Sequence, residues 1–241
     1  MITLQELFDN LAYGEFANIA LGNSPIGEIA AQDIVKMAAH TQMGLNKLHE
    51  RFNLRKGNFT LYLQEGIEVY SLTSDKVVTD TANITSTKYI YTPPELPFAD
   101  DLIKIIDIKD ADDVNYRLND PTALNPIFTP NYDTIKTVPT DPPQVLSITY
   151  QAKYPKLVVD ATTDPTTVNL DIPDFIIEPL LFYIAARVFT GLNSSGGEGS
   201  PAPSSTFLSR YELSCKQIEQ FGLTNKNDYD RGDTFTSNGW V

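Results

Sequence analysis

Apolar residues in the C-terminal half mark the segment around which we expect the chain to be organised. Residues 171–190 are apolar nearly all the way round a helix, and only Glu178 and Arg187 are charged between Phe175 and Phe189. The run is too short and too interrupted for a membrane span, which needs about 18 or more clean apolar residues. We therefore predict a buried central helix, packed either in the core of a monomer or between that core and a neighbouring subunit.

Helical periodicity predicts three further helices. Thr3-Leu-Gln-Glu6 forms a capping box, in which the Thr3 hydroxyl and the Glu6 carboxylate satisfy free amides at a helix start. A long amphipathic helix is predicted from about Ala30 to Phe52, where apolar residues recur every three or four positions. The last helix should begin after Ser204 or Ser205, end at Gly222, and bury a stripe made of Phe207, Leu208, Tyr211, Cys215, Ile218 and Phe221.

The middle of the chain has a period of two instead. Apolar and polar residues alternate over residues 59–64, and Glu65-Gly66 is predicted to turn the chain into a hairpin strand over residues 67–72. Further strands are predicted at residues 102–109 and 144–151, between segments rich in proline. A β-rich insertion thus interrupts the helices.

These elements predict an α+β fold. We expect an antiparallel four-helix bundle with a β-rich insertion between helices 2 and 3 and an extended C-terminal arm. The predicted boundaries place residues 1–56 and 171–222 in the bundle, residues 57–170 in the insertion and residues 223–241 in the arm.

The predicted arm is polar but carries spaced aromatic residues. Its composition cannot form a core, yet Tyr229, Phe235 and Trp240 supply apolar anchors at intervals of five or six residues. We hypothesise that these residues and Val241 form an interface with a partner. The alternative is a frayed terminus without a role.

Charge and composition limit the classes of function. The chain has 31 acidic and 18 basic residues, a net charge of −13, which argues against a sequence-reading nucleic-acid binder. Its 41% apolar residues can fill a core. The single cysteine excludes an intramolecular disulfide, and the first residues lack the pattern of a secretory signal. We expect a protein made and used in a cytosol, or packaged from one.

Candidate catalytic and metal-binding residues are few. The chain has no glycine-rich phosphate loop, GxSxG, HExxH or CxxC motif. His40 and His49 lie nine residues apart on one predicted helix and are interpreted as surface or interface residues, and Cys215 is interpreted as a core residue. We predict no catalytic, cofactor-binding or metal-binding residue and no enzymatic activity, although a carboxylate pair of the glycosidase type stays open.

A cluster of carboxylates could suggest calcium, because this ion takes oxygen ligands at alternating positions. The cluster lacks the glycine and the distal glutamate of a calcium loop, and we interpret it as a solvated hairpin tip that needs no metal. Its members are Asp107, Asp110, Asp112 and Asp113.

Short segments along nearly the whole chain carry a resemblance to a known family. They are Leu4-Gln-Glu-Leu-Phe8, Asn46-Lys-Leu-His-Glu-Arg-Phe52, Leu118-Asn-Asp-Pro121, Phe128-Thr-Pro-Asn-Tyr132, Ile148-Thr-Tyr-Gln-Ala-Lys-Tyr-Pro155, residues 172–189, Tyr211-Glu-Leu-Ser-Cys-Lys-Gln-Ile218 and Asn238-Gly-Trp-Val241. In these segments the chain resembles the head-to-tail adaptor (connector) proteins of tailed bacteriophages, especially short-tailed ones. No single motif among them is diagnostic alone.

The resemblance implies a structural virion protein. Such adaptors form a homo-oligomeric ring, typically of twelve subunits, that docks under the portal protein of the capsid and carries tail or nozzle proteins. DNA passes through the lumen of the ring without specific binding while the genome is packaged, retained and ejected. The expected location is the portal vertex between head and viral tail, reached from the host cytoplasm during tail assembly, with no cofactor and no membrane. The C-terminal arm would contact the portal or a neighbouring adaptor. The alternatives are an acidic hydrolase and a free-standing β module that binds a ligand.

Overall fold

A computed structural model describes residues 2–18, 21, 25–139, 144–194 and 204–223. The chain divides into two compact units. We call residues 1–52 together with 156–241 the helical unit, and residues 53–155 the β unit.

The helical unit contains β1 (Ile2–Thr3), α1 (Leu4–Tyr13), the 3-10 turn η1 (Ala31–Asp33), α2 (Ile34–Arg51), η4 (Pro165–Thr167), β10 (Asn169–Leu170), η5 (Asp174–Ile176), α3 (Ile177–Ser194) and α4 (Ser204–Gln220). The β unit contains β2 (Lys56–Tyr62), β3 (Val69–Ser71), η2 (Ser74–Lys76), β4 (Val77–Val78), η3 (Thr81–Asn83), β5 (Ile90–Tyr91), β6 (Leu102–Lys109), β7 (Ile127–Asn131), β8 (Thr134–Thr137) and β9 (Val145–Ala152).

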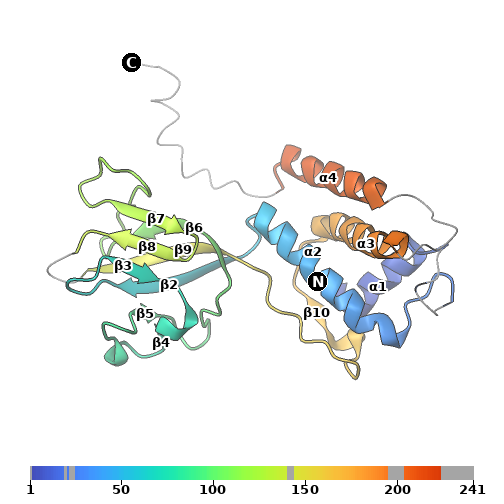
Figure 1. The fold of residues 1–241 in the computed structure, drawn as a ribbon, viewed down its shortest axis with the longest axis horizontal. Coiled ribbons are helices and arrows are strands. Elements are labelled where there is room, and N and C mark those ends of the chain that lie inside the picture. Colours follow the sequence, from blue (N-terminus) through green and yellow to red (C-terminus); the bar gives the residue numbers. More distant parts are fainter. Residues whose placement is uncertain (1, 19–20, 22–24, 140–143, 195–203, 224–241) are drawn as a thin grey trace, which may run out of the picture. The chain divides into compact units, whose positions relative to one another are not determined.

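Helix α3 is the centre of the helical unit, as predicted. It packs against α1, α2 and α4, and Figure 1 shows it directly beside α4. Leu180 and Ile184 are fully buried on it, while the charged Arg187 stays exposed. The nearly all-round apolar pattern of α3 is therefore explained by packing partners on several sides.

Helices α3 and α4 form an antiparallel pair. The Phe189 ring near the end of α3 stacks on Phe207 near the start of α4, with ring centroids 4.9 Å apart. Tyr183 meets Tyr211 edge to face at 5.5 Å, so residues further back on α3 contact residues further along α4. Aromatic pairs of this kind add to the burial of apolar surface.

Helix α2 approaches α3 closely at Gly44. A Cβ atom at this position would lie 2.6 Å from Leu180 Cδ1 and 3.0 Å from Tyr183 Cδ1. A side chain here would require Leu180 and Tyr183 to shift, so glycine lets the two helices approach without that rearrangement. Arg51 at the end of α2 then reaches α4, where it pairs with Glu212 at 2.7 Å and with Glu219 at 2.9 Å.

The predicted antiparallel four-helix bundle is wrong, although an α+β class is compatible with the structure. The helices do not surround one shared core as equals: α1 has only 10 residues and packs against α3 and the η4 segment. The physical reason is that α3 packs against α1, α2 and α4 and lies where these three helices would contact one another in a bundle. Multiple sheets, including a five-stranded one, make up much of the remaining fold.

The start of α1 follows the predicted capping box. The Thr3 amide donates to Glu6 Oε2 at 2.7 Å, and the Glu6 amide donates to Thr3 Oγ1 at 3.1 Å. The start of α3 lies later than predicted, at Ile177, because Pro173 leads into the separate turn η5. Just before it, β10 pairs antiparallel with β1, which joins residues 156–170 to the helical unit rather than to the insertion.

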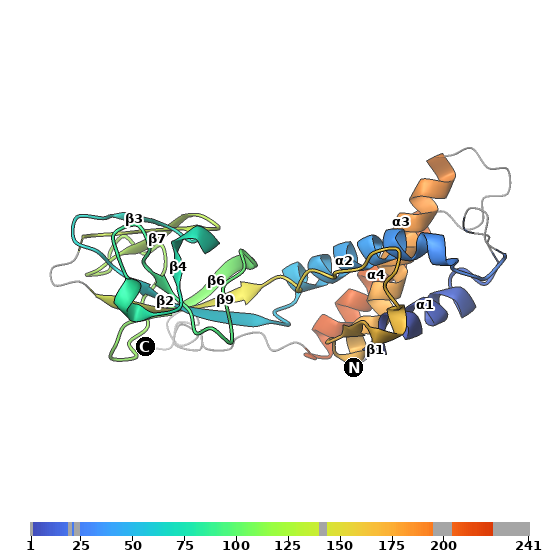
Figure 2. The same cartoon turned by 90° about the horizontal axis from the view of Figure 1, so that it is seen from below.

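The β unit consists of two sheets with a common core. One sheet has the strand order β4-β5-β2-β9-β6 and the other β3-β8-β7; all neighbours are antiparallel except β4 and β5. Figure 2 shows the long strands β2 and β9 side by side. Side chains of both sheets, among them Leu61, Ile148, Tyr70 and Ile135, belong to one buried cluster.

The predicted hairpin after Glu65-Gly66 is wrong. Strand β3 pairs with β8 in the second sheet, and β2 pairs with β5 and β9 instead. Leu61 and Tyr70 are both fully buried, so the turn carries the chain from one sheet to the other across the core. The alternating pattern indicates strands correctly but does not identify their partners.

Candidate functional site

The sulfur of Cys215 lies inside the packed face of α4. The residue is fully buried, as predicted, and burial raises the pKa of the Cys215 thiol to about 11. A thiol of this kind is almost entirely protonated near neutral pH and is a poor nucleophile. Cys215 is therefore a packing residue.

The two histidines of α2 have different surroundings. His49 is buried, and its Nδ1 lies 2.8 Å from the Leu45 carbonyl oxygen, so its predicted place at the surface is wrong. His40 is partly exposed, and its Nδ1 has no hydrogen-bond partner among the described residues. Burial and then the positive charges of Arg187 and Lys36 lower the pKa of His40.

The aspartates after β6 form a turn. Asp110 Oδ1 accepts hydrogen bonds from the amides of Asp112 and Val114, each at 2.9 Å. Asp113 has a positive φ of 65° and accepts from Lys109 Nζ at 2.9 Å. The carboxylates of Asp110 and Asp113 thus stabilise the turn and its flanking strand.

A second charged group, made of Arg55 and Asp101, lies next to the start of β2. Asp101 accepts from Arg55 Nη1 at 2.7 Å and from the Tyr150 hydroxyl at 2.8 Å, and Arg55 also donates to the Lys153 carbonyl at 3.0 Å. Burial and the nearby Asp101 charge raise the pKa of Tyr150. These contacts connect segments that are distant in sequence, so we assign them a role in stabilising the fold.

Within the described ranges, no group of three or more His, Cys, Asp or Glu side chains is placed to hold a metal ion. Within the same ranges, none of the helices combines the length and the apolar composition that crossing a bilayer requires.

The outer side of α2 carries an apolar stripe. Val35, Ala39 and Met43 follow one another at intervals of four residues, and all three are exposed. Val35 is 40% and Met43 is 42% exposed, whereas the opposite side of α2, including Leu45 and Leu48, is fully buried. Helix α2 therefore has a second apolar face that its own unit does not cover.

Helix α4 also leaves apolar residues outside. Leu208 is 49% and Phe221 is 75% exposed, so their predicted place in the buried stripe is wrong. Leu213 on α4 is 59% exposed as well. The reason is that α4 packs mainly against α3, which covers only the face with Phe207, Tyr211 and Ile218.

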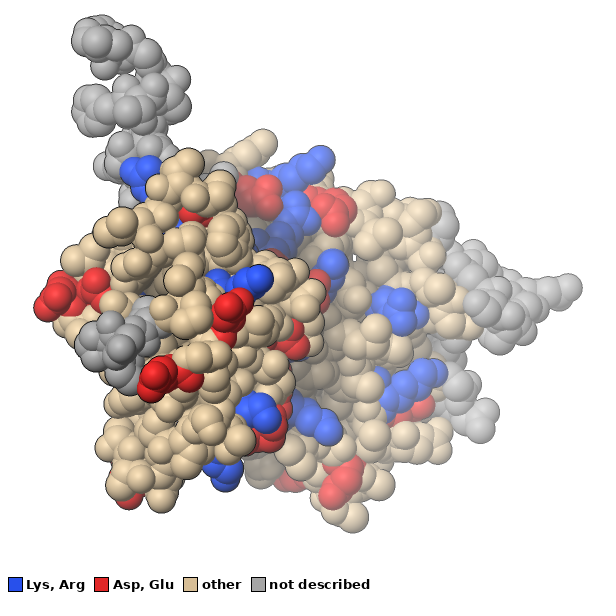
Figure 3. All heavy atoms as spheres, turned by 60° about the vertical axis from the view of Figure 1, so that its left-hand side comes forward, with Lys and Arg blue, Asp and Glu red and all other residues tan. Residues whose placement is uncertain are grey.

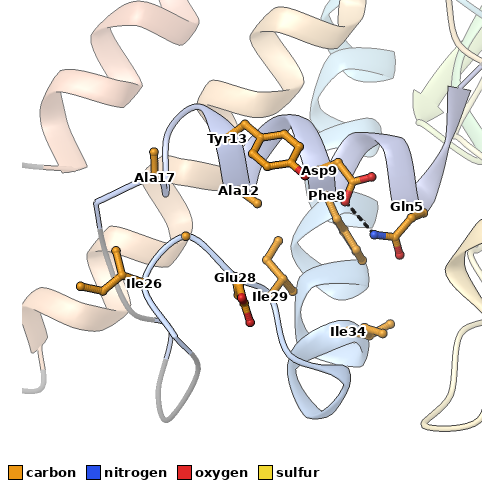
Figure 4. A pocket seen from close by; sticks show the side chains of 11 residues that line it. Gln5, Phe8, Asp9, Ala12, Tyr13, Ala17, Ile26, Glu28, Ile29 and Ile34 are labelled. Atoms are coloured by element: carbon orange, nitrogen blue, oxygen red, sulfur yellow. Dashed lines mark hydrogen bonds between the residues drawn. The ribbon is translucent and has the colours of Figure 1, made fainter.

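A groove lies between α1 and the segment that leads into α2 (Figure 4). Its volume is about 520 Å³, and its lining mixes apolar side chains with polar groups, which supply the larger share of the surface. Tyr13 and Ile26 on its rim are strongly exposed, while Phe8 is buried at its base. Two carboxylates, Asp9 and Glu28, face the same groove, and Gln5 Nε2 donates to Asp9 at 2.8 Å.

Charge is distributed differently around these surfaces. The positive charges of Lys36 and Arg187 both act on His40, where α2 contacts α3. Neither Lys36 nor Arg187 has an ion pair among the described residues, and neither Asp9 nor Glu28 has one. On the face of the β unit that Figure 3 brings forward, by contrast, acidic and basic side chains alternate among wide uncharged areas.

The residues predicted as an interface lie outside the described part of the chain. Tyr229, Phe235, Trp240 and Val241 all fall in residues 224–241. Sequence reasoning did not find the groove, whose lining comes from a helix and an irregular segment. The sequence gives only a weak indication of this groove. Tyr13, Ile26 and Ile29 are apolar residues next to or within a stretch without helical periodicity.

Comparison with known proteins gives no family assignment: no family model matches the chain, and no curated protein is significantly similar to it.

Proposed function

We propose that the chain is a structural adaptor that forms a ring between the portal of a tailed-phage capsid and the tail. The observation that carries this proposal is the apolar surface left on the helical unit, above all the stripe Val35, Ala39 and Met43 on α2. A contiguous exposed apolar face is typical of an interaction surface, whereas single exposed apolar residues are ordinary. The sequence resemblance described above supplies the kind of assembly.

The apolar residues of α4 support the same proposal. Leu213 on this helix is 59% exposed, and Phe221 and Leu223 just past its end are 75% and 49% exposed. A subunit with uncovered apolar faces on two helices can contact neighbours on two sides, as each subunit of a ring must. In this proposal the protein has a binding role and no catalytic one.

The mass of the assembled particle tests the proposal. The full chain is mixed with portal-bearing heads, and with the isolated portal protein, and the complex is measured by native mass spectrometry and electron microscopy. We expect a ring of this chain, of about twelve copies, attached to the portal. A chain that stays monomeric and unattached at concentrations far above those of assembly would contradict the adaptor role.

The C-terminal segment adds an expectation about the portal. In the proposed adaptor, Tyr229, Phe235, Trp240 and Val241 contact the portal or a neighbouring subunit, since aromatic residues often contribute most of the binding energy. Trp240→Ala should weaken attachment by about 1 to 4 kcal/mol without changing subunit stability. If a chain that lacks residues 223–241 attaches to heads as firmly as the full chain, this segment has no such role.

DNA should pass the ring without being held. A net charge of −13 repels phosphates and disfavours tight wrapping of DNA. Binding of the assembled ring to duplex DNA, measured at low and moderate salt, should be weak at both. Submicromolar affinity with a steep dependence on salt would contradict a lumen that repels DNA.

A further inference from the structure

Two surfaces of the helical unit have complementary chemistry. The outer side of α2 combines the apolar stripe Val35, Ala39 and Met43 with two positive charges, Lys36 on α2 and Arg187 on α3, on either side of His40. The groove beside α1 places apolar side chains, such as Phe8 and Ile29, next to the carboxylates of Asp9 and Glu28. One surface is apolar and basic, and the other is apolar and acidic.

The basic row borders the apolar stripe. Lys36 and His40 are four residues apart and share a side of α2, next to the side of Val35 and Ala39. Arg187 joins them from α3, which runs along α2 at this point. Within the described residues no carboxylate neutralises Lys36 or Arg187, although the chain as a whole is strongly acidic. Positive charges left unpaired in such a chain fit an acidic partner.

The acidic groove can receive a helix side of this kind. Its volume of about 520 Å³ is enough for several apolar side chains, and its rim residues Tyr13 and Ile26 are 83% and 68% exposed. Asp9 and Glu28 have no basic ion-pair partner in the described part of the chain. The groove therefore keeps exposed apolar side chains and two carboxylates without a cationic partner.

We propose that the α2 face of one copy docks into the α1 groove of the next copy. Val35 and Met43 would cover the groove lining while Lys36 and Arg187 face Asp9 and Glu28. Ile34 lines the groove and Val35 belongs to the stripe, but successive helical residues point about 100° apart, so the two surfaces point in different directions. A contact between two different surfaces is head-to-tail and repeats from copy to copy, which closes into a ring when the rotation allows.

The apolar stripe distinguishes this partner from DNA. Phosphates would pair with Lys36 and Arg187 but would leave Val35, Ala39 and Met43 in water. A second copy covers both kinds of group. The inference rests on the proposed function, because it names the surfaces through which copies of the adaptor join.

Cross-linking of two different variants tests the pairing directly. Full-length Met43→Cys and Tyr13→Cys proteins, one of them tagged, are mixed and treated with a short bismaleimide. Both positions are exposed, so folding should be spared, and wild type measures the background from buried Cys215. The control replaces one partner by Leu124→Cys, at a position 96% exposed in the β unit.

We expect the mixture to yield heterodimers well above the Leu124→Cys control, and above the homodimers of either variant alone. Adding Arg187→Glu to the Met43→Cys protein should lower the yield about tenfold, and adding Glu28→Arg to its partner should restore it. Equal cross-linking within one variant would indicate a two-fold contact and would overturn the head-to-tail pairing.

The two proposals fail in different ways. If rings form on the portal while the pair yields no more than the control, the surface assignment is wrong and the adaptor role stands. If the heterodimer and its charge-swap rescue appear but the chain never attaches to portal-bearing heads, the pairing stands and the adaptor role is wrong.

Discussion

The two units differ in how completely they cover their own apolar residues. In the β unit, both sheets enclose one buried cluster, and the large apolar residues left outside are scattered, such as Leu96, Val114 and Leu124 in connecting segments. In the helical unit, exposed apolar residues recur along the sides of α2 and α4. The β unit thus uses its apolar residues mainly for its own fold, while the helical unit presents more of them than its fold needs.

An apolar residue therefore affects stability differently on the two sides of one helix. On α3 and on the inner side of α2, an apolar side chain stabilises the unit. On the outer sides of α2 and α4, it adds nothing to the isolated fold. Substitutions can test this division, and the expected effects differ in size.

The largest effect is expected from a charge in the centre of α3. Ile184 is fully buried, so Ile184→Asp places a carboxylate without a partner in the core and should destabilise the helical unit by about 3 to 5 kcal/mol. The helical signal in circular dichroism should melt far earlier than in wild type. The matched control is Leu208→Asp, which puts the same charge at an exposed position of α4 and should leave the melting temperature nearly unchanged. Equal destabilisation by both would remove the distinction between inner and outer faces.

A crowded strand position should rank second. A Cβ atom at Gly57 would lie 2.2 Å from Tyr150 Cζ and would push this ring away from Asp101. Gly57→Ala should therefore destabilise the β unit by about 2 to 3 kcal/mol in urea denaturation. Asn58→Ala, at the next and exposed position of β2, is the control and should stay within about 0.5 kcal/mol of wild type. A stable Gly57→Ala protein would show that Tyr150 can move freely.

A smaller effect is expected from the Tyr150 hydroxyl. Tyr150→Phe removes its hydrogen bond to Asp101, but Arg55 still pairs with that carboxylate, so the loss should be about 1 kcal/mol. Tyr62→Phe in β2 is the comparison, because its hydroxyl makes no hydrogen bond to the described part of the chain. If Asp101→Asn costs as much on the Tyr150→Phe background as on wild type, the hydrogen bond between these two side chains contributes no stability and the prediction is wrong.

The smallest effect concerns Glu15 in the helical unit. Burial raises the pKa of Glu15, and its Oε2 has no hydrogen-bond partner among the described residues. A carboxyl group with a raised folded-state pKa stabilises the fold at low pH, and this contribution is lost as the pH rises through that pKa. Glu15→Gln should therefore raise stability slightly at pH 7 and not at pH 4. Thermal melts at both values measure this, and an equal change at the two would assign the effect to packing.

Local patterns determined much of the secondary structure. The capping box at Thr3 and Glu6, the strand over residues 102–109 and the helix after Ser204 all lie where the sequence places them. These features depend on neighbours a few residues away, so the chain specifies them without reference to the fold. The burial of α3 was also predictable, since its charged residues are few and widely spaced.

Only the tertiary structure decided which elements meet and which faces stay open. Strand β2 pairs with the distant β9 rather than with β3, because strand partners are set by the closure of a common core. Leu208 and Phe221 have the spacing of buried residues but lie outside, because α3 covers only one side of α4. The groove beside α1 joins residues from a helix and an irregular segment, so no single period marks it. Periodicity reports that a side chain is apolar and where it points, but burial depends on what the rest of the chain, or another copy of it, places there.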